Sequence, residues 1–282
     1  MSDVALFRTY LYVPGSKPDV VEKAFNSDAD CIVIDLEDAV HPDKKVDARN
    51  FVAEFIAAGA TKPFLVRINN LESKWGKGDL EAIALPGLAG IRIPKVESVD
   101  TVKQAADILN KAESDAQIHL LIESAKGVGQ LSALASSDPR VAAISLGEAD
   151  LLSDLRATND EALKFCRNAL IVAARAAGLK QPSQSVYANT KDLVGLREST
   201  VHAKETGFFG RSVIHPNQIE TVNEVFTPTQ HEYEKALEML SVFEQIQKSG
   251  ESVMALPNGE MIDPANIYHA QFMVKLFESN KR

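Results

Sequence analysis

The residues best suited to chemistry stand directly after short apolar runs of the sequence. Glu123 and Asp150 follow two successive runs. Paired carboxylates of this kind hold a hard cation such as Mg²⁺ and leave coordination positions for water and substrate. Either carboxylate could instead cap a following helix or pair with a surface lysine. The two together predict a magnesium site.

An arginine, Arg67, stands inside the apolar run FLVRIN. A guanidinium in such surroundings is expected to be buried or partly buried, and it then needs an anionic partner. A substrate carboxylate held by two parallel hydrogen bonds would fit, and so would an internal ion pair with Asp35, Glu37 or Asp38. Both interpretations hold if these acids orient Arg67 and Arg67 then binds substrate. We count Asp35 with the substrate-binding residues and Glu37 and Asp38 with the catalytic ones.

Two further polar residues have simple structural alternatives. Asp263 opens a predicted helix as Asp-Pro-Ala-Asn, which is the pattern of an N-cap followed by proline at the first helical position. Lys95 follows the run IRIP and could be a lysine in solvent. Spacing alone therefore favours a capping role for Asp263 and leaves Lys95 open.

The elements that must position these residues alternate along the chain. Short apolar, β-branched runs are separated by segments with helical spacing, at 101–114, 129–136 and 161–177, which indicates parallel strands joined by crossover helices. Eight such runs predict a (β/α)8 TIM barrel, whose catalytic groups lie at the carboxyl ends of the strands. The runs lie at 10–13, 31–36, 64–68, 90–94, 119–123, 142–147, 183–188 and 211–215.

The pattern changes after Pro216. We predict a long helix around 229–247, a hairpin in SVMALPNGEMI with Asn258-Gly259 at its turn, and a last helix from Pro264. The barrel, with the metal and substrate site, is expected over residues 1–227, and a C-terminal helix-hairpin-helix extension, or lid, over 228–282. Two helices and a hairpin are marginally stable alone, so the extension is expected to pack on a neighbouring subunit.

Composition limits the class of protein. The 282 residues carry a net charge of -9, which gives no general attraction for nucleic acid or for an anionic membrane. Two cysteines are too few for a disulfide framework or a zinc site. The first residues lack a long apolar stretch and an A-x-A-like cleavage site, and no stretch approaches 18 uninterrupted apolar residues, so we expect neither secretion nor membrane insertion. We expect a cytoplasmic protein with no nucleic-acid or membrane partner.

Ordered motifs along most of the chain resemble those of the citrate lyase beta subunit and malyl-CoA lyase family, within the pyruvate-utilising barrel superfamily. Motifs this numerous are specific for the family but not for one substrate. They are RTYLYVPG at 8–15, DLEDAVHPDKKVDAR at 35–49, VRIN at 66–69, IPKVES at 93–98, LIESAKGV at 121–128, LGEADLLSDL at 146–155, GFFGRSVIHPNQI at 207–219 and GEMID at 259–263.

The resemblance implies a Mg²⁺-dependent carbon-carbon lyase. Such an enzyme cleaves or forms a 3-hydroxyacyl-CoA thioester, with acetyl-CoA or another acyl-CoA and a 2-oxo acid on the other side of the reaction. The resemblance places Mg²⁺ on Glu123 and Asp150, and Arg67 on the carboxylate and oxygen of the 2-oxo acid. It makes Asp263 the general acid or base that reaches a neighbour's active site. A homotrimer or hexamer is expected.

Coenzyme A would enter with the substrate at the barrel mouth. Arg8, Lys17 and Arg211 are candidate partners for its phosphates, although scattered basic residues in an acidic protein can simply keep it soluble. An acyl carrier protein could replace free coenzyme A, as in the citryl-thioester-cleaving subunit of a multi-protein citrate lyase.

Three departures from the family pattern bear on the acyl group. The loop SDLRAT after the sixth run lacks the usual glycine, KQPSQSVYANTKD lacks the usual isoleucine-aspartate pair, and Ser124 stands where threonine is typical.

A non-thioester class II pyruvate aldolase would share the metal carboxylates and the arginine, but such aldolases generally carry histidine where this chain has Asp38. A non-catalytic thioester-binding barrel is a third interpretation, against which the retention of the whole predicted residue set argues.

Overall fold

The computed structural model describes residues 6–249, 254–255, 261–262 and 264–279. Contacts divide the chain into two compact units, Met1–Asn223 and Glu224–Arg282. In the described residues, no helix is both long and apolar enough to cross a membrane. Cys31 and Cys166 are both buried and neither forms a disulfide.

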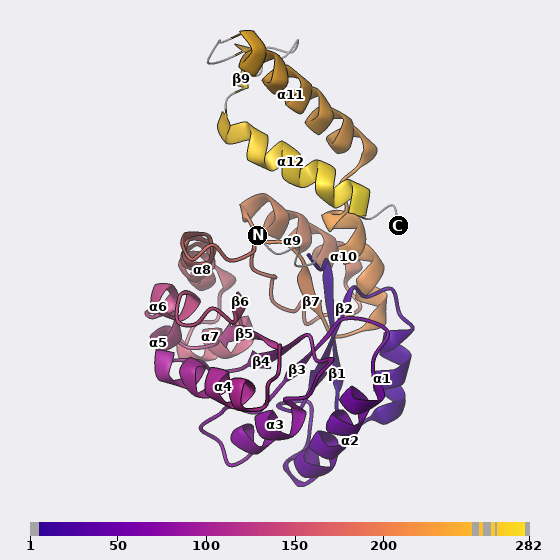
Figure 1. Cartoon of the computed structure of the whole chain (residues 1–282), viewed down its shortest axis with the longest axis vertical. Coiled ribbons are helices and arrows are strands. Elements are labelled where there is room, and N and C mark those ends of the chain that lie inside the picture. Colours follow the sequence, from indigo (N-terminus) through magenta and orange to yellow (C-terminus); the bar gives the residue numbers. More distant parts are fainter. Residues whose placement is uncertain (1–5, 250–253, 256–260, 263, 280–282) are drawn as a thin grey trace. The chain divides into compact units, whose positions relative to one another are not determined.

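The described part of the first unit contains a curled sheet of seven parallel strands (Figure 1). Their spatial order is β6-β5-β4-β3-β2-β1-β7, so each of the first five strands lies beside the next one along the chain, and β7 lies beside β1. Seven of the eight predicted strands are therefore confirmed. They are β1 (Thr9–Pro14), β2 (Cys31–Asp35), β3 (Phe64–Arg67), β4 (Gly90–Ile93), β5 (Gln117–Ile122), β6 (Val141–Leu146) and β7 (Arg211–Val213).

The predicted strand at 183–188 is wrong. Among the described residues this segment contributes one parallel bridge, between Gln184 and Arg211. The Gln184 N–H donates to the Gly210 carbonyl at 2.8 Å, and the Gln184 carbonyl accepts from the Ser212 N–H at 2.9 Å. The segment SQSVYA is largely polar and has one β-branched residue, Val186, so little favours a longer strand between β7 and β6. Closure into a full (β/α)8 barrel stays a prediction.

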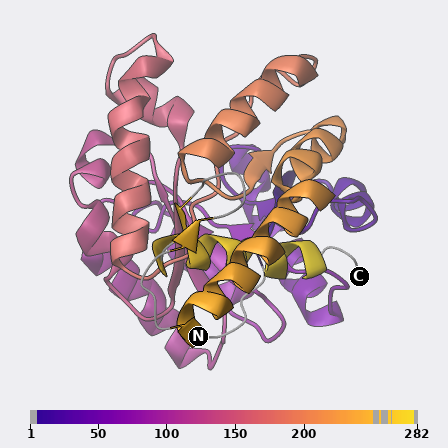
Figure 2. The same ribbon diagram turned by 90° about the horizontal axis from the view of Figure 1, so that it is seen from above.

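Helices flank the outer face of the curled sheet, as crossover connections between parallel strands require (Figure 1). Figure 2 shows the helices of this unit arranged around its strands from a second direction. The helices predicted at 101–114, 129–136 and 161–177 are confirmed as α4, α6 and α8. The α-helices of the unit are α1 (Pro18–Phe25), α2 (Lys45–Ala58), α3 (Gly76–Ile83), α4 (Val99–Lys111), α5 (Ala125–Val128), α6 (Leu131–Ala135), α7 (Glu148–Asp154), α8 (Lys164–Ala176), α9 (Leu193–Thr206) and, at its end, α10 (Ile219–Phe226).

The hydrophobic core lies on both faces of the sheet, because the strands are apolar on both faces. β2 is buried along its whole length, as is β4, and parallel strands covered on both sides typically read as continuous apolar runs. Three basic side chains interrupt this pattern: Arg92 in β4, His119 in β5 and Arg211 in β7 are all buried. Polar groups therefore occupy part of the space enclosed by the curled sheet.

The second unit is a helical pair with a short antiparallel strand pair. The predicted helices at 229–247 and from Pro264 are confirmed as α11 (Gln230–Ser249) and α12 (Pro264–Ser279). Buried Ala236, Ala270 and Met273 pack together, and the rings of Tyr233 and Phe277 stack with centroids 4.2 Å apart. β8 (Met254–Ala255) pairs with β9 (Met261–Ile262). The turn predicted at Asn258-Gly259 lies outside the described residues.

Candidate active site

The carboxyl ends of five neighbouring strands bring together the acids and cations that the sequence singled out. Asp35 ends β2 and is in register with Arg67, which ends β3. Lys95 follows β4, Glu123 follows β5, and Asp150 lies in the first turn of α7 after β6. Parallel strands place their carboxyl ends at the same edge, so these side chains share one mouth.

Arg67 is held by carboxylates on two sides. Its Nε and Nη2 donate to the two oxygens of Asp35 at 2.7 and 2.6 Å, which is a bidentate pair. Its Nη1 lies 3.0 Å from Glu37 Oε2 and donates to Asp38 Oδ2 at 3.2 Å. Burial alone would lower the pKa of Arg67, but the hydrogen bonds to Asp35 and the charges of Asp35 and Glu37 together outweigh it, and the pKa is raised. The internal ion pairs are thus present, and they fix the guanidinium in place.

Asp35 is itself fixed by the backbone. Its carboxylate accepts hydrogen bonds at 2.9 Å from the N–H groups of Glu37 and Ala39, and its side chain is 1 % exposed. Burial raises the pKa of Glu37, while Arg67 and Lys95 oppose that rise. Among the described residues Glu37 Oε2 has no hydrogen-bond partner, although Arg67 Nη1 lies 3.0 Å away. The acids after β2 therefore act as a rigid support for the two cations.

Lys95 belongs to the same cluster and does not simply extend into solvent. Its Nζ donates to Glu37 Oε1 at 2.6 Å and lies 4.0 Å from Asp150 Oδ2, while its backbone N–H donates to Glu123 Oε2 at 3.0 Å. Its φ of 54° is in the left-handed region, which costs a non-glycine residue roughly 1–2 kcal/mol. Lys95 is therefore ion-paired within the cluster, although its side chain is 42 % exposed. Its position directly after a buried strand is the feature of the sequence that indicates this end of the sheet.

Glu123 is a buried carboxylate among other acids. Burial, with Glu37 and Asp150 nearby, raises the pKa of Glu123 to about 8. Gly147 makes room for it, because a Cβ at that position would overlap the Glu123 carboxylate. Asp150 is about half exposed. Glu123 and Asp150 therefore form the inner and outer carboxylates of one site.

These two carboxylates fit a magnesium ion. In the described ranges, no group of three or more His, Cys, Asp or Glu side chains is arranged around a metal position. Mg²⁺ does not need three such groups, because it keeps several water ligands and is commonly held by one or two carboxylates. The raised pKa of Glu123 reflects repulsion between acids as well as burial, and a divalent cation would relieve that repulsion.

A cavity of about 210 Å³ opens beside this cluster. Arg67 and Glu123 line it on one side, and the Arg67 guanidinium carbon lies 5.3 Å from the centroid of the Tyr12 ring. Other lining residues are Asp38, Ser145, Gly147, Asp150, Ser185 and Ser212. A small carboxylate entering this cavity would meet the guanidinium and the paired acids together.

The structure does not bring all candidate coenzyme A residues to the mouth. Arg8 precedes β1 and pairs with Asp30 at 2.7 Å, and Arg211 begins β7 and is buried, so both lie at the amino ends of strands. Lys17 is exposed and directly precedes α1 at the carboxyl end of β1. Lys17 alone of the three remains placed for a ligand at the mouth. Asp263 lies outside the described residues.

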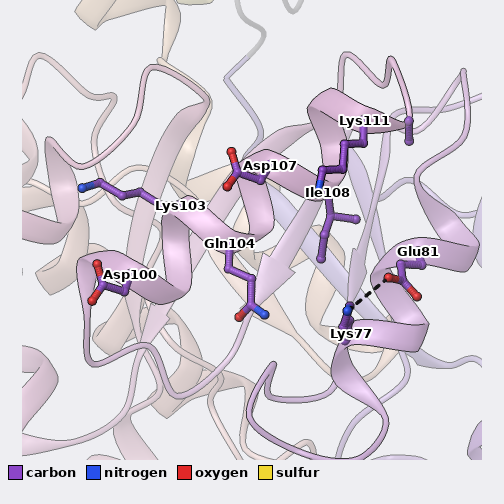
Figure 3. A pocket seen from close by; sticks show the side chains of 9 residues that line it. Lys77, Glu81, Asp100, Lys103, Gln104, Asp107, Ile108 and Lys111 are labelled. Carbon is purple, nitrogen blue, oxygen red and sulfur yellow. Dashed lines mark ion pairs between the residues drawn. The ribbon is translucent and has the colours of Figure 1, made fainter.

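A larger groove of about 550 Å³ lies on the outer surface between α3 and α4 (Figure 3). Its charged residues are exposed, and Lys77 pairs with Glu81 at 3.8 Å within α3. Exposed charges of mixed sign give no anchoring site for a ligand. The groove shares no lining residue with the cavity at the strand ends, and we assign it no part in catalysis.

Comparison with known proteins gives a consistent set of relatives. Residues 8–216 match the model of the HpcH/HpaI aldolase/citrate lyase family. The chain is 33 % identical to citrate lyase subunit beta of Leuconostoc mesenteroides over 99 % of this chain and 96 % of that one. It is 35 % identical to a (3S)-malyl-CoA thioesterase of Cereibacter sphaeroides over 94 % of this chain and 92 % of that one.

Solved structures of Mycobacterium tuberculosis proteins share the fold. The protein CitE, solved in complex with magnesium, acetoacetate and coenzyme A, superposes with a TM-score of 0.80 at 26 % identity over 97 % of this chain and 99 % of that one. A citrate lyase beta subunit complexed with oxaloacetate and magnesium has a TM-score of 0.70 at 27 % identity over 79 % of this chain and 98 % of that one.

Proposed function

The chain belongs to the HpcH/HpaI aldolase/citrate lyase family, and on that premise we propose that it is a Mg²⁺-dependent lyase acting on a 3-hydroxyacyl-CoA thioester. It would cleave the substrate into an acyl-CoA, such as acetyl-CoA, and a 2-oxo acid, or join the two. The observation that carries this proposal is the juxtaposition of a fixed guanidinium, Arg67, with two carboxylates, Glu123 and Asp150, around one cavity. Relatives solved with magnesium, oxaloacetate and coenzyme A support it.

Each side chain has a proposed task in this reaction. Arg67 would bind the carboxylate of the 2-oxo acid and stabilise charge on its oxygen, with Asp35 and Glu37 holding the guanidinium in place. Glu123 and Asp150 would hold Mg²⁺. The cation supplies, when bound, a Lewis acid for the oxygen that changes between hydroxyl and carbonyl. Lys95 would keep Glu37 and Asp150 in place through its contacts at 2.6 and 4.0 Å.

Cleavage involves two proton transfers and the movement of one electron pair. The substrate hydroxyl loses its proton to a carboxylate of the site, for which Asp38 at the cavity wall is our candidate. The carbon-carbon bond breaks, its electrons pass to the carbon beside the thioester, and an enolate forms. Asp263 of a neighbouring subunit would protonate that carbon. The enzyme would accordingly be a homo-oligomer, a trimer or hexamer in the cytoplasm, with its C-terminal extension, residues 228–282, covering the neighbour's closed (β/α)8 barrel.

A second reaction has a specific observation in its favour. Relatives at 35 % identity are named (3S)-malyl-CoA thioesterase. In thioester hydrolysis, water adds to the thioester carbonyl and the coenzyme A thiol leaves, while the carbon-carbon bond stays intact. In both reactions Arg67 would bind the substrate carboxylate, and the paired acids would hold Mg²⁺. We rank the lyase first because the family model and the citrate lyase relatives agree on it.

The test is a substrate panel with product identification. Malyl-CoA, citramalyl-CoA and citryl-CoA are incubated with purified protein, with Mg²⁺ or with EDTA. A lyase releases glyoxylate, pyruvate or oxaloacetate, respectively, together with acetyl-CoA, and EDTA stops it. Free coenzyme A without 2-oxo acid identifies the thioesterase. If none of the three thioesters gives any product, a free coenzyme A substrate is refuted. The next substrates to test are then an acyl carrier protein thioester and a pyruvate aldol.

A further inference from the structure

A second cavity lies at the opposite end of the strands, at their amino ends. Its volume is about 460 Å³, and no described residue lines both this cavity and the one at the candidate active site. Much of its wall is apolar, from Phe7, Tyr10, Leu65, Leu88 and Phe209. Three basic residues, Arg92, His119 and Lys180, also line it, and of these Arg92 and His119 are buried. We refer to this space as the lower cavity.

Arg92 is a buried cation that forms no ion pair with a carboxylate among the described residues. Its residue is 2 % exposed. Its Nη1 donates to the Tyr12 hydroxyl at 2.8 Å and to Ser212 Oγ at 3.4 Å, and its guanidinium carbon lies 5.2 Å from the Tyr10 ring centroid. Its Nε has no hydrogen-bond partner in the described residues. A buried charge with an unused donor is costly unless an anion completes it.

His119 adds a second unused polar atom beside it. Arg92 and His119 are register partners on the adjacent strands β4 and β5, so their side chains lie on the same face of the sheet. His119 is 7 % exposed, and in the described part of the chain its Nδ1 has no hydrogen-bond partner. Burial, with the Arg92 charge close by, lowers the pKa of His119 to about 3, so the ring is neutral at pH 7. A neutral imidazole still offers one N–H donor.

A tyrosine separates the lower cavity from the candidate active site. The Tyr12 ring centroid lies 5.6 Å from the Arg92 guanidinium carbon and 5.3 Å from that of Arg67. Arg67 is satisfied by Asp35, Glu37 and Asp38, whereas the groups that raise the pKa of Arg92 are Tyr12, Tyr10 and Cys31. The described carboxylate at the lower cavity is Asp115, which is exposed. Arg67 therefore has carboxylate partners, whereas Arg92 has none among the described residues.

We propose that the lower cavity is a binding site for a small organic carboxylate. The carboxylate would accept hydrogen bonds from Arg92 Nε and His119 Nδ1, and an apolar body would lie against Phe7, Leu88 and Phe209. An inorganic anion such as chloride would fill little of a 460 Å³ space with apolar walls. The site does not depend on the proposed reaction, since none of its residues takes part in it.

The test is calorimetric titration of the full chain with benzoate, and with benzyl alcohol as a neutral molecule of similar shape. Arg92→Met removes the cation at similar volume, and Ala143→Phe fills the lower cavity while leaving Arg92 in place. Arg67→Lys is the matched control, because it alters the other carboxylate-binding arginine. Circular dichroism confirms that each variant is folded before titration.

We expect benzoate to bind one site in the unmodified chain and in Arg67→Lys. Binding should weaken at least tenfold in Arg92→Met and disappear in Ala143→Phe, and benzyl alcohol should not bind. If Arg92→Met does not fold, benzoate binding to Ala143→Phe alone tests the proposal. Absence of benzoate binding to the unmodified chain would overturn the proposal, and so would binding unaffected by Ala143→Phe. Phosphate binding that depends on Arg92 while benzoate does not bind would overturn the assignment to an organic carboxylate.

Discussion

Magnesium affinity should fall steeply below pH 8 because Glu123, a proposed ligand, is a buried carboxylate. Burial, with Glu37 and Asp150 nearby, raises the pKa of Glu123 from 4.5 to about 8 in the metal-free protein. A raised carboxyl pKa means that the protonated form dominates at pH 7, and a protonated carboxyl is a poor ligand. Metal binding at neutral pH must therefore release a proton from Glu123.

The size of the effect follows from the titration. With a pKa of about 8, Glu123 is ionised in about half of the molecules at pH 8 and in about 1 % at pH 6. The observed affinity for Mg²⁺ should then fall roughly 50-fold between these values, or about 2 kcal/mol. The stability of the metal-free fold responds in the opposite direction: the part that protonated Glu123 contributes is complete below pH 4.5 and is lost as pH rises through about 8.

The assay is calorimetric titration with MgCl₂ from pH 6 to 8.5, in two buffers of different ionisation enthalpy, so that proton release is measured directly. Glu123→Gln should bind Mg²⁺ weakly and without the pH slope. Asp107→Asn removes an exposed carboxylate of the outer groove and should behave as the unmodified chain. An affinity that does not change between pH 6 and 8, or a slope that persists in Glu123→Gln, would refute the reasoning.

Three substitutions test the support of the site. Lys95→Met removes the hydrogen bond of 2.6 Å to Glu37; we expect a stability loss of roughly 1 kcal/mol by chemical denaturation at pH 7.5, smaller than for a buried pair because Lys95 is 42 % exposed. Gly147→Ala places a methyl group on the Glu123 carboxylate and should weaken Mg²⁺ binding more than tenfold by titration, whereas unchanged binding would mean that Glu123 is not a ligand. Arg67→Lys loses the bidentate geometry; we expect KM for the 2-oxo acid in the condensation direction to rise at least tenfold, and an unchanged KM would remove Arg67 from substrate binding.

The sheet was predictable because its strands are short, buried and apolar. CIVID and GIRI stand out as short runs rich in β-branched residues between helical patterns, and both are strands. The segment 183–188 fits the spacing of the other runs but forms only one bridge among the described residues, because its composition is largely polar. The spacing of apolar runs along a sequence predicts how many elements to expect, but it does not determine which backbone groups pair by hydrogen bonds.

The site was predictable where one residue carried its own signal. Arg67 inside an apolar strand implied an anionic partner, and Asp35 provides it. The same signal, a guanidinium inside an apolar run, is present at Arg92 in GIRIP, which was not among the predicted site residues. Lys95 could not be placed, because its contacts depend on a left-handed backbone turn and on side chains 28 to 58 positions away. Contacts across strand ends follow from the packed fold and not from local sequence.

Isotope incorporation tests the central claim, carbon-carbon cleavage, most directly. Malyl-CoA is turned over in D₂O with Mg²⁺, and the acetyl-CoA formed is analysed by mass spectrometry. Cleavage through an enolate predicts one deuterium in the acetyl methyl group and one glyoxylate for each acetyl-CoA. Malate and free coenzyme A, with no deuterium on carbon and no glyoxylate, would contradict the lyase and establish hydrolysis of the thioester instead.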